Sequence, residues 1–326
     1  MQSDKVLAQI RFDMRSPAIG AATGKLYAAA LDMAEYADAH GFNSIFTAEH
    51  HGSPDGYLPA SCVLGAGLAA RTKRATLCLY AIVVPLYDPL RLAEDLAVLD
   101  HVAQGRLSVC AAGGYLAAEY AMFAKDYDKR GKQVEEIVGV LRQAWTGEPF
   151  PYQGRMVQVT PKPFTPGGPE LMLGGSIPAA ARRAARIADG LVTHLPDLYQ
   201  IYVDEAVKLG KRPAPFRRKG PTCMFVAEDK EQGWGKVLPH FLHDFNEYGR
   251  WAHSAANPGT PFKAAASRDD LAGTMYQVVT PDEAIALGRE RDELYVHPLI
   301  GGLDPAIGWS SLRLFAEKVL PAVRGQ

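Results

Sequence analysis

Short runs of apolar residues alternate along the chain with longer segments in which apolar residues recur every three or four positions. The short runs indicate buried β-strands at residues 6–12, 44–47, 75–80, 107–112, 170–173, 191–193, 222–227 and 293–299. The longer segments indicate amphipathic helices, as where Tyr27, Leu31, Ala34 and Ala37 share one face. Strand and helix alternate without reversal, which predicts a parallel sheet.

Eight such units are the number that a closed barrel needs. We therefore predict an α/β fold, a (β/α)8 TIM barrel, with residues 1–326 as a single domain. A doubly wound open sheet is the alternative. It is disfavoured because no G-x-G-x-x-G follows the first strand, where a dinucleotide-binding domain carries its phosphate turn.

One segment interrupts the alternation. Residues 149–169 are rich in proline and glycine around a short extended run, and we predict an insertion that forms a small hairpin at Gln153 and Gly154 beside the barrel. Two further stretches, about 210–220 and 253–273, are irregular.

Charge and cysteine content narrow the class of protein. The chain has 35 basic and 36 acidic residues, a net charge of -1, which argues against a nucleic-acid or anionic-membrane partner. The N-terminus has no secretion signal and no apolar run is long enough to span a bilayer, so we expect a cytoplasmic protein. Four widely spaced cysteines without a C-x-x-C pair favour reduced core thiols over disulfides or zinc ligands: Cys62, Cys78, Cys110 and Cys223.

Candidate chemistry is expected where the strands end, because active sites of parallel barrels lie at the carboxyl ends of the strands. The second strand ends in Glu49, His50 and His51. A histidine there can exchange protons near neutral pH, although two loop histidines can also simply hydrogen-bond to the backbone. A shared metal ion is disfavoured, since adjacent side chains of an extended chain point to opposite faces.

Three other strand ends have features of a ligand site. The run from Leu79 to Pro85 offers an apolar wall, but any buried strand looks similar. Ala112, Gly113 and Gly114 allow close approach of the backbone to a ligand, or form an ordinary tight turn. Gly174, Gly175 and Ser176 precede a helix expected near Pro178 and so indicate an anion site, unless Ser176 is a plain helix cap.

Taken in order, these motifs resemble the luciferase-like flavin monooxygenase family over nearly the whole chain. The resemblance rests on these stretches: Glu49 to His51, Arg71 to Arg74, Pro85 to Asp95, Leu99 to Asp100, Gly105 to Leu107, Leu141, Trp145 to Pro149, Gly174 to Ser176, Ala188 to Gly190, Thr280 to Glu283 and Leu312 to Leu320.

The resemblance implies an enzyme that binds reduced FMN non-covalently and oxygenates a small organic substrate with dioxygen through a C4a-peroxyflavin. It implies a separate flavin reductase and a homodimer as partners. By similarity, His50 corresponds to the general base near the flavin and Glu49 to its structural neighbour. The Tyr80–Ala81 bond corresponds to a cis peptide that supports the isoalloxazine ring, and Gly174 to Ser176 correspond to the phosphate-binding loop.

One position departs from the family pattern. Luciferase itself has an arginine for the flavin phosphate where this chain has Gly113, next to Ala112. Either phosphate binding is weaker in this chain, or Arg182 or Arg183 supplies the contact. The departure also argues against light emission. Two rivals stay open: hydride transfer with the deazaflavin F420, which other members of the family use, and a non-catalytic flavin-binding relative. The substrate is not indicated.

Overall fold

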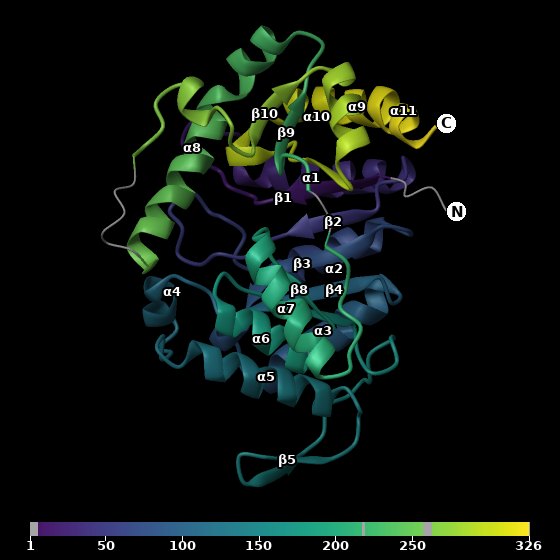
Figure 1. Cartoon of the computed structure of the whole chain (residues 1–326), viewed down its shortest axis with the longest axis vertical. Helices are drawn as coiled ribbons and strands as arrows, with labels where there is room; N and C mark the ends of the chain where they lie inside the picture. The colour runs from purple at the N-terminus through teal and green to yellow at the C-terminus, as the bar shows by residue number, and fades with distance from the viewer. Residues whose placement is uncertain (1–5, 217–218, 257–262, 326) are drawn as a thin grey trace.

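The computed structural model describes residues 6–216, 219–256 and 263–325, so the two irregular stretches are described only in part. Within this part of the chain, parallel strands form one nine-stranded sheet (Figure 1). Its strands are β1 (Leu7–Phe12), β2 (Ser44–Thr47), β3 (Thr76–Val83), β4 (Leu107–Ala112), β7 (Glu170–Gly174), β8 (Gly190–Val192), β9 (Cys223–Val226), β10 (Tyr276–Val279) and β11 (Glu293–Val296).

The strand order separates a barrel from a doubly wound sheet. It runs β10-β9-β11-β1-β2-β3-β4-β7-β8, so the last strand of the chain pairs with the first, with Leu7 opposite Glu293. From β1 to β8 the order never reverses, whereas a doubly wound sheet must reverse. The described residues contain no ladder that joins β8 to β9 or β10.

All eight predicted strands are present, and the limits of 44–47 and 107–112 agree at both ends. The ninth strand, β10, was not predicted. Its four residues, Tyr276–Val279, equal the length of β2, which was predicted, and they begin just after the stretch 253–273 that was interpreted as irregular. It lies at the edge of the sheet and pairs with β9.

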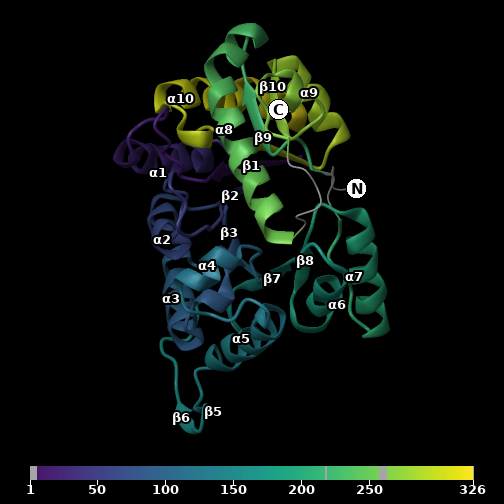
Figure 2. The ribbon, with the colours of Figure 1, turned by 90° about the vertical axis from the view of Figure 1, so that its left-hand side faces the viewer.

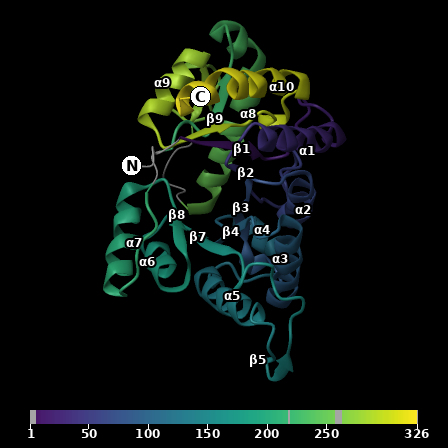
Figure 3. The ribbon, with the colours of Figure 1, turned by 90° about the vertical axis from the view of Figure 1, so that its right-hand side faces the viewer.

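Helices connect the strands and cover the sheet (Figures 1 and 3). They are α1 (Thr23–Ala39), α2 (Ser61–Arg71), α3 (Pro89–Ala103), α4 (Ala117–Met122), α5 (Arg130–Ala144), α6 (Pro178–Ile187), α7 (Pro196–Lys208), α8 (Lys230–Ala256), α9 (Pro281–Glu290), α10 (Pro305–Leu314) and α11 (Leu320–Arg324). Side chains that cap the first turn stabilise the start of several of these helices. The Asp88 side chain accepts bonds from the first backbone N–H groups of α3, and Thr280 with Glu283 forms a capping box on α9.

The predicted hairpin is confirmed. Strands β5 (Phe150–Tyr152) and β6 (Arg155–Val157) pair antiparallel across Gln153 and Gly154, both of which have a positive φ. The base is anchored by Phe150, which is buried, but the tip does not pack beside the sheet: Met156 is 66% exposed and the hairpin projects beyond α5 (Figures 1 and 2).

The long helix α8 has the strongest influence on the site. It runs from the β9–β10 side of the molecule toward β7 and α4 (Figure 2), and so brings residues far along the chain to the ends of β1 and β2. None of the described helices is both long and apolar enough to cross a membrane. The four cysteines are free thiols, and three of them are buried.

Candidate active site

The candidate residues gather at the carboxyl ends of the strands. Arg11 lies near the end of β1, His50 follows β2, Tyr80 and Ala81 lie in the second half of β3, and Gly174 ends β7. Parallel strands place all these positions at one edge of the sheet, the edge that carries active sites in barrels of this kind.

His50 is held between two polar partners and is only 7% exposed. Its Nδ1 atom lies 2.9 Å from Glu119 Oε1, and its Nε2 atom lies 3.2 Å from the Tyr115 hydroxyl. Glu119 belongs to the short helix α4. A carboxylate at one ring nitrogen fixes the orientation of an imidazole, which is the arrangement a proton-transferring histidine needs.

Glu49 and His51 form a second buried pair beside the first. The Glu49 carboxylate lies 3.0 Å from His51 Nε2 and accepts hydrogen bonds from the Val83 N–H and the Tyr87 hydroxyl. The two adjacent histidines thus face different carboxylates. Glu49 is fully engaged by protein groups, which fits a structural neighbour of His50 better than a group that reacts. Among the described residues there is no cluster of three or more His, Cys, Asp or Glu side chains that could hold a metal ion.

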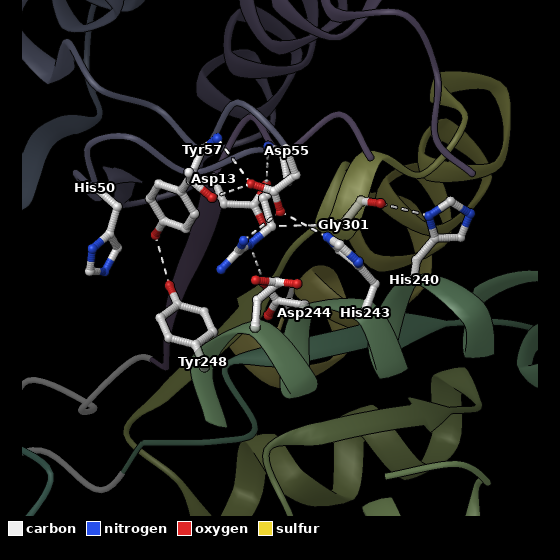
Figure 4. Close-up of polar contacts among 12 residues, drawn as sticks. Asp13, His50, Asp55, Tyr57, His240, His243, Asp244, Tyr248 and Gly301 are labelled. Carbon is white, nitrogen blue, oxygen red and sulfur yellow. Dashed lines mark hydrogen bonds and ion pairs between the residues drawn. The ribbon is translucent and has the colours of Figure 1, made fainter. Parts of the chain in front are cut away.

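Aromatic rings surround His50. The Trp251 ring lies 4.2 Å from the imidazole, Tyr57 5.0 Å, Tyr115 5.4 Å and Tyr248 6.2 Å, measured between ring centroids. Tyr248 and Trp251 come from the last turns of α8. Figure 4 shows that the Tyr57 and Tyr248 hydroxyls meet beside the histidine. The wall excludes water and suits a flat or apolar ligand.

A cluster of charges lies behind this wall. Arg15 is fully buried, and its guanidinium lies 2.5 Å from Asp55 and 2.8 Å from Asp244. His243 binds Asp55 from the other side at 2.8 Å (Figure 4). Burial acts to raise the pKa of Asp55, but the hydrogen bond from His243 and the charge of Arg15 outweigh it and hold that pKa well below its usual value. This carboxylate is therefore committed to its partners.

His297, after β11, has the opposite character to His50. Burial and the Arg11 charge lower the pKa of His297 to about 3, so the ring is neutral near pH 7. Neither of its ring nitrogens has a hydrogen-bond partner within the described part of the chain. A neutral, buried imidazole of this kind is a poor general acid.

The residues predicted to bind the flavin lie at the ends of β3, β4 and β7: Tyr80, Ala81, Ala112, Gly113, Gly174, Gly175 and Ser176. The Tyr80–Ala81 peptide bond is cis, as the resemblance implies. Gly175 leaves no room for a side chain, since a Cβ atom there would lie 2.3 Å from Ala180 Cβ, and at Gly174 a Cβ atom would be a tight fit, 3.1 Å from Cys110 Sγ. The glycines therefore let this loop pack closely against the start of α6 and against β4.

The start of α6 is open to an anion. Its first residue is Pro178, and its N-cap is Ile177, with no side chain capping the helix. Ser176 is thus not the N-cap, and its exposed side chain stays available. Helix N-termini that lack a capping side chain present N–H groups and a partial positive charge to ligands.

The arginines near this loop have different surroundings. Arg183 binds Glu135 at 2.8 Å, and Arg182 is exposed. The arginine beside Gly113 is instead Arg130, at the start of α5: a Cβ atom on Gly113 would lie 3.6 Å from Arg130 Cγ. The Arg130 side chain stacks on Tyr127, 3.9 Å from the ring centroid to the guanidinium carbon, and makes no ion pair with any described residue.

A family comparison places this geometry in context. The model of the luciferase-like monooxygenase family matches residues 6–297. The chain belongs to this family. It shares the fold of the monooxygenase RslO1 from Streptomyces bottropensis, with a TM-score of 0.79, 25% identity and coverage of 97% of this chain and 99% of that one. The predicted luciferase-like barrel and the flavin-dependent oxidoreductase class are confirmed.

Related family members use different cofactors. The FMNH(2)-dependent dimethylsulfone monooxygenase of Pseudomonas fluorescens is 24% identical over 315 residues, 90% of this chain and 86% of that protein. The F420-dependent glucose-6-phosphate dehydrogenase of Nakamurella multipartita is 29% identical over 182 residues, which cover 53% of this chain and 54% of that protein. The oxygenase component of the flavin-dependent trigonelline monooxygenase of Acinetobacter baylyi is 29% identical over 126 residues, which cover 38% of this chain and 35% of that protein. An uncharacterized protein of Sinorhizobium fredii, 30% identical over 171 residues, is also matched over only 50% of its length.

Seen within this family, the structure brings together His50, Glu49, the Tyr80–Ala81 bond and the two glycine loops at one edge of the sheet. Glu119 and Arg130 were not predicted from the sequence. A lone acid in the apolar segment Ala117–Met122 is a signal that could have indicated Glu119. Arg130 carries no comparable local signal, because its proximity to Gly113 depends on how α5 packs against β4.

Proposed function

We propose that this luciferase-like enzyme uses reduced FMN and dioxygen to add one oxygen atom to a small organic substrate. The observation that carries the proposal is an anion site at the same sheet edge as the His50–Glu119 pair. This site would consist of the uncapped start of α6 after Gly174 to Ser176 and of Arg130, whose aliphatic stem lies beside Gly113 and which makes no ion pair with a described residue.

The residues present fit the phosphate of FMN. The glycine loop allows close approach, the N-terminus of α6 supplies N–H donors, and Ser176 adds a hydroxyl. Arg130 would supply the positive charge that the chain lacks at Gly113. Tyr80 and Ala81 would lie against the ring, between the phosphate site and His50.

When bound, reduced FMN supplies the two electrons with which dioxygen is split between the substrate and water. His50 would move a proton at the reacting face, with Glu119 holding its Nδ1 side. Glu49 would keep the His51 segment in place, because all its described partners are protein groups. The aromatic wall would exclude water from the reaction.

The remaining partners follow from the family and are proposals too. A relative is named as an oxygenase component, which supports a separate reductase that delivers reduced flavin. A homodimer and a cytoplasmic location stay predictions.

The test is a titration of the purified protein with FMN and F420, each oxidised and reduced, followed by rapid mixing of the tighter reduced complex with oxygen. We expect tighter binding of reduced FMN and the transient absorbance of a C4a-peroxyflavin. Preferential binding of F420 without any reaction with oxygen would point to hydride transfer, and binding of neither would point to a non-catalytic relative.

A variant separates proton transfer from cofactor binding. His50→Asn should slow substrate-dependent turnover by about 100-fold or more, the usual size of a general acid–base contribution, while the Kd for reduced FMN changes little. His101→Asn, at an exposed histidine of α3, is the matched control. Equal turnover in the two variants would remove His50 from the reaction.

A further inference from the structure

Two arginines at the carboxyl end of β1, Arg11 and Arg15, have different surroundings. Arg15 is fully buried and paired with Asp55 and Asp244. Arg11, near the end of β1, has no carboxylate within ion-pair distance among the described residues. The acceptors of its hydrogen bonds are the hydroxyls of Tyr248, at 2.7 Å, and Tyr57, at 3.4 Å.

Both bonds of Arg11 come from one nitrogen, Nη2. Its Nε and Nη1 atoms have no hydrogen-bond partner in the described part of the chain. These two atoms of Arg11 are not fully buried. In Arg15, by contrast, two guanidinium nitrogens are fully buried and have no hydrogen-bond partner among the described residues. The free edge of the Arg11 guanidinium is therefore accessible. An unpaired guanidinium at a partly buried position is costly, which favours a role in binding.

The two tyrosines add a further donor. Their hydroxyls lie 2.7 Å apart, so one donates to the other, and the second hydroxyl proton has no acceptor within the described residues. Burial raises the pKa of both Tyr57 and Tyr248, so both stay protonated. Arg11 and this pair thus present several N–H and O–H donors and no free anionic acceptor.

The carboxylates around Arg11 do not act as its ion-pair partners. Asp244 lies 2.8 Å from Arg15 Nε and accepts a hydrogen bond from Tyr276 at 2.8 Å, and Asp55 is held by Arg15 and His243. Asp13 accepts hydrogen bonds from the Arg15 and Gly301 backbone N–H groups. None of these three carboxylates lies within ion-pair distance of Arg11, and each is engaged by other groups.

We propose that Arg11, with the hydroxyls of Tyr57 and Tyr248, binds an oxyanion of the substrate, and that the substrate is an organic acid. A planar carboxylate matches the fork of a guanidinium, which can donate two parallel bonds to it. The Tyr57 ring lies 5.0 Å from His50, so an acid held here lies against the aromatic wall beside the proposed base. The inference rests on the proposed function, whose substrate class it specifies.

The experiment uses two acid and amide pairs as probes: benzoate with benzamide, and methanesulfonate with methanesulfonamide. Binding to the full-length protein is measured by calorimetry with and without reduced FMN. We expect each acid to bind more tightly than its amide. Arg11→Met should weaken binding of the preferred acid by about 10- to 100-fold, the size expected for a lost charge-assisted bond, and leave amide binding unchanged.

Three variants complete the test. Arg11→Lys should recover part of the affinity, because it keeps the charge but loses the fork. Tyr248→Phe should weaken acid binding without loss of charge. Arg155→Met, at the exposed hairpin tip, is the control with the same change of charge. Thermal unfolding of each variant checks that it is folded.

Several results would overturn the inference: no binding of either acid, equal binding of acid and amide to the unaltered protein, or equal acid affinity in Arg11→Met and Arg155→Met. An effect of Arg11→Met on reduced FMN alone would assign Arg11 to the cofactor instead. Failure of FMN to bind the unaltered protein would reject the proposed function, and the probes titrated without FMN would still test Arg11.

Discussion

At the scale of single residues, the partner of a side chain decides what it does. His50 and His297 both follow strands of the same sheet and both are buried. His50 has Glu119 at hydrogen-bond distance from its Nδ1 atom. His297 forms no hydrogen bond with a described residue: the Asp13 carboxylate lies 3.4 Å from its Nε2 atom, and burial and the charge of Arg11 disfavour a proton on its ring. The first is arranged to carry a proton, and the second to remain neutral.

The neutral state of His297 predicts that stability falls with pH. Its pKa is about 3 in the folded protein and about 6.5 in an unfolded chain. Between these values the unfolded state binds more protons, so the free energy of unfolding decreases as the pH falls from about 6.5 toward 3. From pH 7 to pH 5 the loss from this residue should be about 2 kcal/mol.

Urea unfolding of the unaltered protein and of His297→Asn at both pH values measures this loss. The variant should lack the His297 contribution, so that its free energy of unfolding falls by about 2 kcal/mol less. Other titrating groups cancel in the comparison. Equal decreases in the two proteins would mean that His297 takes up its proton alike in the folded and unfolded states.

At the scale of elements, the proposed anion site draws on the starts of two helices. The start of α6 would supply N–H groups and a glycine loop, and the start of α5 would supply the charge of Arg130. Arg183, on α6, is instead paired with Glu135 on α5 and ties the two helices together.

This division predicts how the cofactor phosphate contributes to binding. Arg130→Met should weaken binding of FMN by about 10-fold or more, because a charge-assisted bond is lost. Riboflavin, which has the ring but no phosphate, should bind both proteins alike. Flavin fluorescence measures both constants, and Arg142→Met, on the same helix but paired with Asp189, is the control. A parallel loss of riboflavin binding would show that Arg130 supports the ring or the fold instead.

The same elements show how much the sequence can predict. Strands bounded by turn residues could be predicted because each is a distinct apolar run. The glycine loops could be predicted because paired glycines allow the backbone to pack closely. The strand β10 was missed although β2, of the same length, was found, because β10 begins just after a stretch, 253–273, that was interpreted as irregular. Glu119 was missed because its partner, His50, lies 69 positions away in the sequence, and Arg130 because its neighbour, Gly113, lies 17 positions away. Only tertiary packing brings each pair together.

At the scale of the whole molecule, the buried charge cluster joins three distant parts of the chain. Arg15 follows β1, Asp55 follows β2, and Asp244 lies on α8. The Arg15 guanidinium also lies under the Trp251 and Tyr57 rings, 4.5 and 4.6 Å from their centroids. The cluster therefore fixes α8 across the mouth of the barrel and sets the position of the aromatic wall over His50.

Removal of Arg15 should thus destabilise the protein strongly. Arg15→Met leaves two buried carboxylates without their cation, and we expect a loss of about 3–5 kcal/mol in the free energy of unfolding. Arg91→Met, which breaks an exposed pair with Asp95 on α3, should change it by about 1 kcal/mol at most. Urea unfolding at pH 7 measures both.

A combined variant distinguishes the charges from the packing. Arg15→Met with Asp55→Asn and Asp244→Asn removes the two unpaired carboxylates as well, so it should regain part of the stability that Arg15→Met loses. If the combined variant were instead the less stable one, the stacking of Arg15 under the Trp251 and Tyr57 rings, together with the hydrogen bonds from His243 and Tyr276, would be what holds α8. In either case the position of the aromatic wall over His50 depends on contacts that Arg15, Asp55 and Asp244 make behind it.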